Sequence, residues 1–278
     1  MTKYFIASKD VVRGVAGDDH EDMRLYTELG WELASSRLYI NYLLQKGEID
    51  KDNDVIVTNY DRQFLYSKHF KNVISYSDFV NNVQSSDIVE DLVPGLGEWI
   101  REMTVDIDMT QYKEEIYCNL INTDLDLGNI DDIVKNDDNF ICLVVRKRSH
   151  CPHRSMPEES VDAIINFYKN NGFSVYIMGK DCENYDNGKN VFHVSYRDFA
   201  TLINSEKCLK LITPLSGGGM IRFFTGICPT YVFLTYDEKR LNHLLYWGDG
   251  IDAFKNTFKD GKMHFVHSIE EILIEKFE

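Results

Sequence analysis

The stretch Thr213-Pro-Leu-Ser-Gly-Gly-Gly-Met220 decides the fold of the second half of this sequence. The apolar run at 209–213 predicts a buried strand, and residues 220–225 predict a helix that Gly226 closes. Glycines between a strand and a helix let the backbone approach a ligand, and the start of a helix offers unpaired N–H groups and a positive dipole end. The stretch therefore predicts an anion site suited to a diphosphate. Tight packing of the turn without a ligand is the alternative.

The composition is that of a globular protein. With 278 residues, 44% hydrophobic and 27% charged, the chain is long enough for two domains with cores of their own. The sequence contains neither a signal-peptide pattern nor an uncharged run of about 18 residues, so we expect a cytoplasmic protein without a membrane span. Six cysteines without a CxxC pair predict neither a disulfide framework nor a structural zinc site. A formal net charge of −15 disfavours binding to nucleic acid.

A cluster of cations follows a strongly apolar run. Residues 140–145 predict a strand buried on both faces, and Arg146-Lys-Arg-Ser-His-Cys-Pro-His-Arg154 comes directly after it. At the carboxyl end of a parallel strand this segment would open into a ligand crevice. Arginine suits phosphate because its planar guanidinium donates paired, charge-assisted hydrogen bonds. A solvated loop that keeps the protein soluble is the alternative.

Strands and helices alternate along the chain. In the second half, strands are predicted at 140–145, 173–178, 191–194, 209–213, 230–234 and 264–267. Helices are predicted to begin near Met156, Tyr196 and Met220 between these strands, and near Ser268 after the last of them. In the first half, strands at 4–7, 54–58 and 72–76 accompany a long helix over 25–44. This spacing predicts doubly wound parallel α/β sheets. The polar segment 135–139 places a domain boundary near residue 136.

Together these features resemble a GT-B glycosyltransferase. The resemblance is carried by two α/β halves, the basic turn at Arg146, the Met178-Gly-Lys-Asp181 turn, and Ser216-Gly-Gly-Gly219 opening a late helix. It implies two Rossmann-like domains that face a central cleft. An acceptor domain would span residues 1–135, and a nucleotide-sugar-binding domain would span residues 136–278.

The resemblance also implies a reaction, the transfer of a sugar from a nucleotide-diphosphate sugar to a carbohydrate acceptor. Because the arginines and the helix start would supply the positive charge that a divalent ion otherwise provides, we expect no metal or other cofactor. Charge on the leaving diphosphate grows in the transition state, so donors aimed at it would accelerate transfer. Lys180 in solvent and Tyr196 in the core are plain alternatives to ligand contacts. The implied donor-site residues are Arg146, Arg148, Arg154, Gly179, Lys180, Tyr196, Ser216, Gly217, Gly218 and Gly219.

The acceptor side has candidate general bases. The loop after the first strand carries Asp18, Asp19 and His20, any of which could take the proton of an acceptor hydroxyl, and Asp19 is our first choice. Alternatively, these acids only cap the following helix. A second loop, Asn59-Tyr-Asp-Arg62, could line the same cleft.

Other signals and function classes stay open. Asp106-Ile-Asp108 and Asp124-Leu-Asp126 match a short metal-diphosphate pattern, but a carboxylate pair needs further oxygen ligands to hold a divalent ion. His150, Cys151 and His153 are metal ligands by type only, so no metal site is predicted. A sugar-nucleotide epimerase, or a nonenzymatic nucleotide- or glycan-binding module, would also use a diphosphate site.

Overall fold

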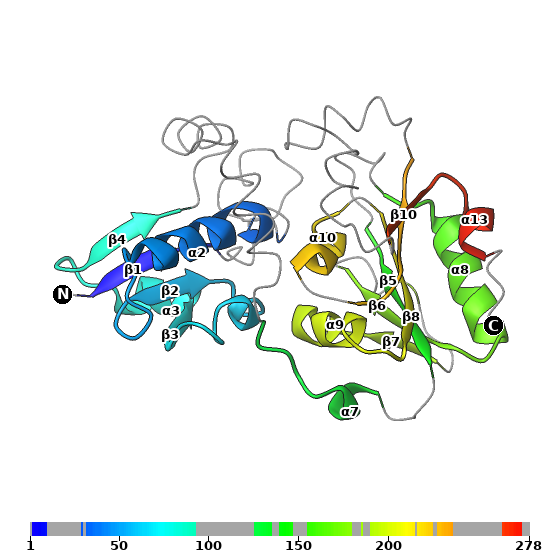
Figure 1. Ribbon diagram of the computed structural model, residues 1–278, viewed down its shortest axis with the longest axis horizontal. Helices are drawn as coiled ribbons and strands as arrows, with labels where there is room; N and C mark the ends of the chain where they lie inside the picture. Colours follow the sequence, from blue (N-terminus) through cyan, green and yellow to red (C-terminus); the bar gives the residue numbers. More distant parts are fainter. Residues whose placement is uncertain are drawn as a thin grey trace. The chain divides into compact units, whose positions relative to one another are not determined.

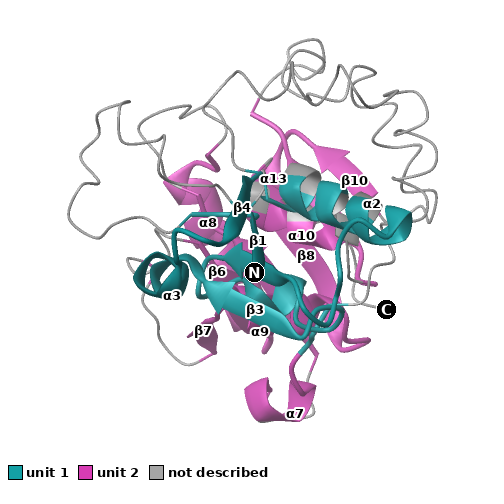
Figure 2. Cartoon of the chain, turned by 90° about the vertical axis from the view of Figure 1, so that its left-hand side faces the viewer, with its two compact units in different colours: residues 1–127 teal, residues 128–278 magenta. Residues whose placement is uncertain are grey.

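The computed structural model divides the chain into two compact units, Met1–Leu127 (unit 1) and Gly128–Glu278 (unit 2), coloured separately in Figure 2. The division lies after Leu127, whereas the sequence pattern places it near residue 136. The short helix α7 (Ile130–Ile133) contacts α9 (Tyr196–Ile203), which draws it into unit 2. The structure describes residues 2–9, 29, 32–92, 125–134, 139–146, 155–179, 185, 190–214, 216–224, 227–235 and 263–273.

Unit 1 contains a four-stranded sheet in the order β3-β2-β1-β4, and all its strand pairs are parallel. Its strands are β1 (Lys3–Ile6), β2 (Val55–Thr58), β3 (Asn72–Ser75) and β4 (Ile88–Asp91). The sequence pattern predicts the first three. It does not predict β4, because this edge strand is largely exposed and has only a short apolar run.

The long helix predicted for unit 1 begins with an irregular turn in the described residues. A π-helical turn, η2 (Glu32–Ser36), runs directly into α2 (Arg37–Lys46). Two further elements follow β2 and β3, namely the 3-10 turn η3 (Gln63–Leu65) and α3 (Tyr76–Asn82). Neither is predicted from the sequence, because both are too short for a helical repeat of apolar residues to show.

Unit 2 contains a six-stranded sheet in the order β10-β9-β8-β5-β6-β7, again with parallel pairs throughout. All six strands are predicted to within about two residues, because continuous apolar runs mark buried parallel strands. The two sheets confirm the predicted pair of Rossmann-like α/β units. The strands are β5 (Phe140–Val144), β6 (Ser174–Met178), β7 (Val191–His193), β8 (Cys208–Pro214), β9 (Thr230–Phe233) and β10 (Met263–Val266).

Helices cover both faces of the unit 2 sheet. Figure 1 shows α8 (Glu158–Asn170) and α13 (Ile269–Leu273) on one face, and α9 and α10 (Gly217–Phe224) on the other. The apolar side of α8 packs on alternate residues of β5 and β6, and burying each such side chain contributes about 1.5–3 kcal/mol. The buried residues of this interface include Ile141, Leu143, Val161, Ile164, Tyr168, Val175 and Ile177.

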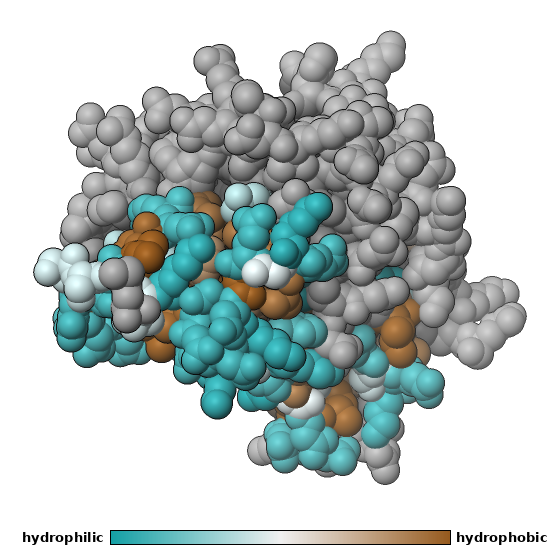
Figure 3. Space-filling view, turned by 60° about the vertical axis from the view of Figure 1, so that its left-hand side comes forward, coloured by the Kyte–Doolittle hydropathy of each residue, from teal (hydrophilic) through white to brown (hydrophobic). Residues whose placement is uncertain are grey.

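The described surface and cysteines agree with the globular composition. Figure 3 shows one face on which described residues are mostly hydrophilic and apolar ones form small separate groups. Within the described ranges, no helix is long and apolar enough to cross a bilayer. Cys142, Cys208 and Cys228 are buried free thiols.

Candidate functional site

The carboxyl ends of β5 and β8 form the switch point of the unit 2 sheet. Strands β5, β6 and β7 follow one another outward in one direction, whereas β8, β9 and β10 follow in the other. The chain therefore leaves β5 and β8 in opposite directions, and ligands of such sheets bind in the crevice outside the carboxyl ends of these two strands. The predicted anion-binding segments directly follow these two strands in the sequence.

Arg146 supplies a fixed positive charge at the carboxyl end of β5. It lies two residues after β5, is 9% exposed, and its Nη1 donates to Ser155 Oγ at 3.4 Å. A buried guanidinium acts on an anion through a medium of lower dielectric constant than water, which strengthens the attraction. Arg148, Arg154 and Lys180, the other predicted cations, lie outside the described residues.

Helix α10 begins at the neighbouring strand end. Its first residue is Gly217 rather than Met220, so the predicted glycine turn is the first turn of the helix itself. The Gly219 N–H donates to Ser216 Oγ at 3.4 Å, which makes Ser216 an N-cap. The positive end of the α10 dipole therefore lies just beyond the carboxyl end of β8.

Packing, and not only access to a ligand, explains two of the glycines. A Cβ on Gly218 would lie 2.6 Å from Met178 Cε and 3.0 Å from Val144 Cγ1. A Cβ on Gly219 would lie 2.3 Å from Thr213 Oγ1. The missing side chains allow the first turn of α10 to lie directly on the ends of β5, β6 and β8. The tight-packing alternative therefore applies at both positions, and the anion site at this turn stays a prediction.

Gly179 directly follows β6, at the same end of the sheet. Its φ of 146° is a conformation that side chains rarely adopt, and a Cβ there would lie 2.0 Å from Val145 O. The Val145 N–H donates to Met178 O at 2.9 Å. Only glycine allows this close approach, so Gly179 fixes the path of the chain at the ends of β5 and β6.

Tyr196 lies farther along the sheet. It is the first residue of α9, after β7, and the sheet order places β7 two strands away from β5. It is half-buried, and the neighbouring Ser195 caps α9 by accepting from Asp198 N at 3.1 Å. The described geometry thus places Gly179 and the first turn of α10 against the end of β5, which Arg146 follows, whereas Tyr196 follows the edge strand β7.

The predicted acceptor-side and metal residues fall mostly outside the described ranges. Asp18, Asp19, His20, Asp106, Asp108, Asp124, His150, Cys151 and His153 are among them. Asp126 is described, and its Oδ2 accepts from Ser67 Oγ at 3.0 Å. Within the described parts of the chain, no group of three or more histidine, cysteine or acidic side chains is arranged to hold a metal ion.

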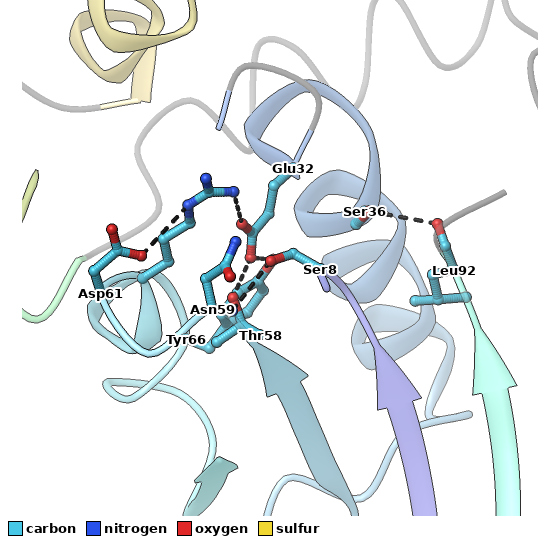
Figure 4. A network of polar contacts seen from close by, with 9 residues as sticks. Ser8, Glu32, Ser36, Thr58, Asn59, Asp61, Tyr66 and Leu92 are labelled. Carbon is cyan, nitrogen blue, oxygen red and sulfur yellow. Dashed lines mark hydrogen bonds and ion pairs between the residues drawn. The ribbon is translucent and has the colours of Figure 1, made fainter. Parts of the chain in front are cut away.

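Unit 1 contains a buried polar network that the sequence pattern does not predict (Figure 4). Glu32 on the π-helical turn is fully buried, and its carboxylate accepts from Arg62 Nη1 at 3.0 Å and from Tyr66 Oη at 3.1 Å. Thr58 Oγ1, at the end of β2, donates to the same carboxylate. Burial raises the pKa of the Tyr66 hydroxyl well above its usual value, so this hydroxyl stays a donor to Glu32.

Arg37 adds a second buried cation beside Glu32. Its Nε donates to Leu65 O at 3.3 Å, and burial lowers the pKa of its guanidinium to about 10. One sequence signal could have indicated the network. Glu32, Ser36 and Arg37 interrupt the apolar face of the predicted helix, and buried charges are found paired.

Comparisons with known proteins give structural neighbours only. No protein-family model and no curated protein matches the chain. The E. coli ADP-heptose lps heptosyltransferase II has a TM-score of 0.48 at 11% identity, covering 84% of this chain and 85% of that chain. The E. coli heptosyltransferase WaaC with ADP-2-deoxy-2-fluoro heptose has a TM-score of 0.44 at 9% identity, covering 84% and 88%.

A structure of a Methanocaldococcus jannaschii UDP-GlcNAc 2-epimerase, in complex with UDP-GlcNAc and UDP, also matches. Its TM-score is 0.35 at 10% identity, covering 98% of this chain and 91% of that chain. At such identities few residues are shared with any neighbour. The roles of residues in this chain therefore have to be argued from its own geometry.

Proposed function

We propose that this protein transfers a sugar from a nucleotide-diphosphate sugar to a carbohydrate acceptor, and that unit 2 binds the diphosphate of the donor. The observation that carries the proposal is that the buried Arg146 follows β5 and the first turn of α10 follows β8, the two neighbouring strands at the switch point of the sheet. Positive charge is placed there in a chain whose formal net charge is −15, as an anionic ligand requires.

The same groups would assist the reaction as well as binding. When the bond between the sugar and the diphosphate breaks, negative charge grows on the departing oxygen. A guanidinium and helix N–H groups that are already in place stabilise that charge without rearranging. They also supply the positive charge that a divalent ion provides in other enzymes, so we infer that transfer needs no metal.

Two Rossmann-like units favour a reaction with two substrates. Each unit has a switch point of its own, between β5 and β8 in unit 2 and between β1 and β4 in unit 1. Unit 1 can therefore hold a second ligand, which we take to be the acceptor. Deprotonation of the acceptor by Asp18, Asp19 or His20 stays a prediction, with Asp19 the first choice.

Binding and turnover of nucleotide-diphosphate sugars test the proposal. Calorimetry with ADP, UDP, GDP and CDP should find at least one nucleoside diphosphate that binds the purified protein. Release of the same diphosphate from its sugar conjugate should then increase when a mixture of oligosaccharides is added. If no nucleoside diphosphate binds, the proposed donor site is wrong. Epimerisation of the sugar without transfer would favour the epimerase alternative.

A further inference from the structure

The Asn59-Tyr-Asp-Arg62 turn lies beyond the carboxyl end of β2 in unit 1. Tyr60 at its tip is 70% exposed, more than any other large hydrophobic side chain in the described ranges. Its neighbours Asn59 and Arg62 are buried. The turn therefore presents one aromatic ring to solvent while the residues on either side of it are fixed in the protein.

Both sides of the turn are held by hydrogen bonds. Asn59 N–H donates to Ser8 Oγ at 3.1 Å, and Arg62 N–H donates back to Asn59 O at 3.0 Å. The Arg62 side chain is 1% exposed and pairs with the fully buried carboxylate of Glu32. A ring on so firmly held a backbone loses little conformational freedom when a ligand stacks on it, which favours binding.

The Asn59 side chain has hydrogen-bonding capacity that the described protein does not use. Asn59 is 5% exposed, and its Nδ2 has no hydrogen-bond partner in the part of the chain that the structure describes. Leaving a buried donor unpaired costs about 1–3 kcal/mol, so such a group calls for an explanation. Nδ2 is closed to solvent in the structure, so the Asn59 side chain must rotate toward solvent before a ligand oxygen can accept from it. Figure 4 shows Asn59 and Ser8 next to each other at the ends of their strands.

The chemistry of the turn suits an uncharged, polyhydroxylated ring. An aromatic face stacks on the apolar C–H face of a sugar, while an amide and a carboxylate bind hydroxyl groups around its rim. Asp61 supplies the carboxylate, which is 32% exposed and whose Oδ1 lies 3.7 Å from Arg62 Nε. The exposed charged side chain of the turn is thus a carboxylate, while its partner Arg62 is buried, which disfavours phosphorylated ligands in a chain of net charge −15.

We propose that Asn59, Tyr60 and Asp61 form a carbohydrate subsite, with the Tyr60 ring as stacking platform and the Asn59 amide as hydrogen-bond donor. The inference rests on the proposed function, because the ligand of this subsite would be the carbohydrate acceptor. It adds to that function the residues of unit 1 that contact the acceptor.

Saturation-transfer difference NMR on the full chain tests the subsite. The probes are the methyl glycosides of glucose, galactose, mannose and N-acetylglucosamine, each with and without the nucleoside diphosphate that binds best. At least one glycoside should receive saturation from the wild-type protein. Tyr60→Ala should reduce that signal at least about fivefold, and Tyr60→Phe, which keeps the ring, should preserve most of it.

Two further variants separate binding from folding. Asn59→Leu keeps the side-chain volume and removes the amide, so it should weaken the glycoside signal while the melting temperature stays the same or rises. Phe192→Ala removes another exposed ring, 43% exposed on β7 of unit 2, and should leave the signal unchanged.

Several outcomes overturn the subsite. The subsite is wrong if no glycoside receives saturation from the wild-type protein, or if the glycoside signal is unchanged in Tyr60→Ala. It is also wrong if the saturation-transfer signal of a mononucleotide depends on Tyr60 while that of a glycoside does not. Calorimetry of nucleoside diphosphate binding on the same samples distinguishes the two proposals. Diphosphate binding without glycoside binding removes the subsite alone, whereas glycoside binding without diphosphate binding removes the donor site and leaves the subsite standing.

Discussion

At the scale of single residues, Arg146 is the described side chain that tests the proposed diphosphate site most directly. We expect Arg146→Ala to weaken nucleoside diphosphate binding by about tenfold or more, because a charge-assisted hydrogen bond contributes about 1.5–3 kcal/mol. Arg146→Lys keeps the charge but not the planar guanidinium, so its affinity for the nucleoside diphosphate should lie between those of the wild type and Arg146→Ala. Isothermal titration calorimetry measures the change.

The matched control for Arg146 is Lys207→Ala. Lys207 directly precedes β8, so this variant removes one positive charge at the amino ends of the strands, on the opposite side of the same sheet from Arg146. It should bind nucleoside diphosphate as the wild type does. Equal losses of affinity in both variants would mean that the overall charge of unit 2, and not Arg146, attracts the ligand.

Gly218 tests the packing of α10 on the strand ends. Because a Cβ at this position would lie 2.6 Å from Met178 Cε, Gly218→Ala should destabilise the protein by about 1–3 kcal/mol, with diphosphate affinity falling where the turn shifts. Adding Met178→Ala removes the crowding, so the two changes should together cost less than the sum of their separate effects. Urea unfolding of the wild type, the two single variants and the double variant gives the coupling energy between the two positions. Additive losses of stability would contradict the contact between residue 218 and Met178.

Residue-scale chemistry is also where the sequence predicts least. The triple glycine indicates a close approach of backbone, but a sequence does not say whether a ligand or another strand occupies the space. Gly218 and Gly219 contact side chains of β5, β6 and β8, which become neighbours only in the folded sheet. Glu32, Arg62 and Tyr66 likewise meet only after folding, from separate elements.

At the scale of elements, the pair between Glu32 and Arg62 ties the π-helical turn to the segment after β2. Both side chains are almost fully buried, and removing Arg62 takes away the cation that hydrogen-bonds the buried Glu32 carboxylate, with Arg37 remaining nearby. Arg62→Met should therefore lower the free energy of unfolding by about 3–5 kcal/mol. Chemical denaturation followed by circular dichroism measures this change.

A surface pair in the same unit is the control for Arg62. Lys3 Nζ lies 2.8 Å from Glu90 Oε1, and both side chains are partly exposed. Lys3→Met should cost no more than about 1 kcal/mol. A similar loss of unfolding free energy in Lys3→Met and Arg62→Met would show that the buried pair of Glu32 and Arg62 contributes no more to stability than a surface pair.

Elements are predicted well from the sequence where burial is uniform along them. All of β5 is buried, and its apolar run makes it recognisable. Helix α10 is misplaced at its start, because glycines are usually assigned to loops and only Ser216 as N-cap reveals the true beginning. β4 and α3 depend on pairing and packing with distant segments, which no local pattern contains.

At the scale of the whole molecule, two parallel sheets with the same kind of switch point provide two places where ligands can bind. Acidic residues outnumber basic ones by 45 to 30, so the molecule as a whole repels anions. Binding of the proposed diphosphate would therefore depend on local positive charge at the strand ends. The affinity should fall as ionic strength rises, since partly exposed charges are screened by salt.

The same charge distribution leads to a prediction about metal ions. If Arg146 and the first turn of α10 neutralise the departing diphosphate, no divalent ion is needed for that purpose. Release of nucleoside diphosphate from the sugar donor should therefore continue at an unchanged rate in EDTA, and added magnesium or manganese should not increase it. Arg146→Ala should slow release in EDTA, and manganese should restore part of the lost rate, because the ion replaces the missing charge. A wild-type enzyme that is inactive in EDTA and regains activity with manganese would contradict the prediction and direct attention to the paired aspartates around Asp106 and Asp124.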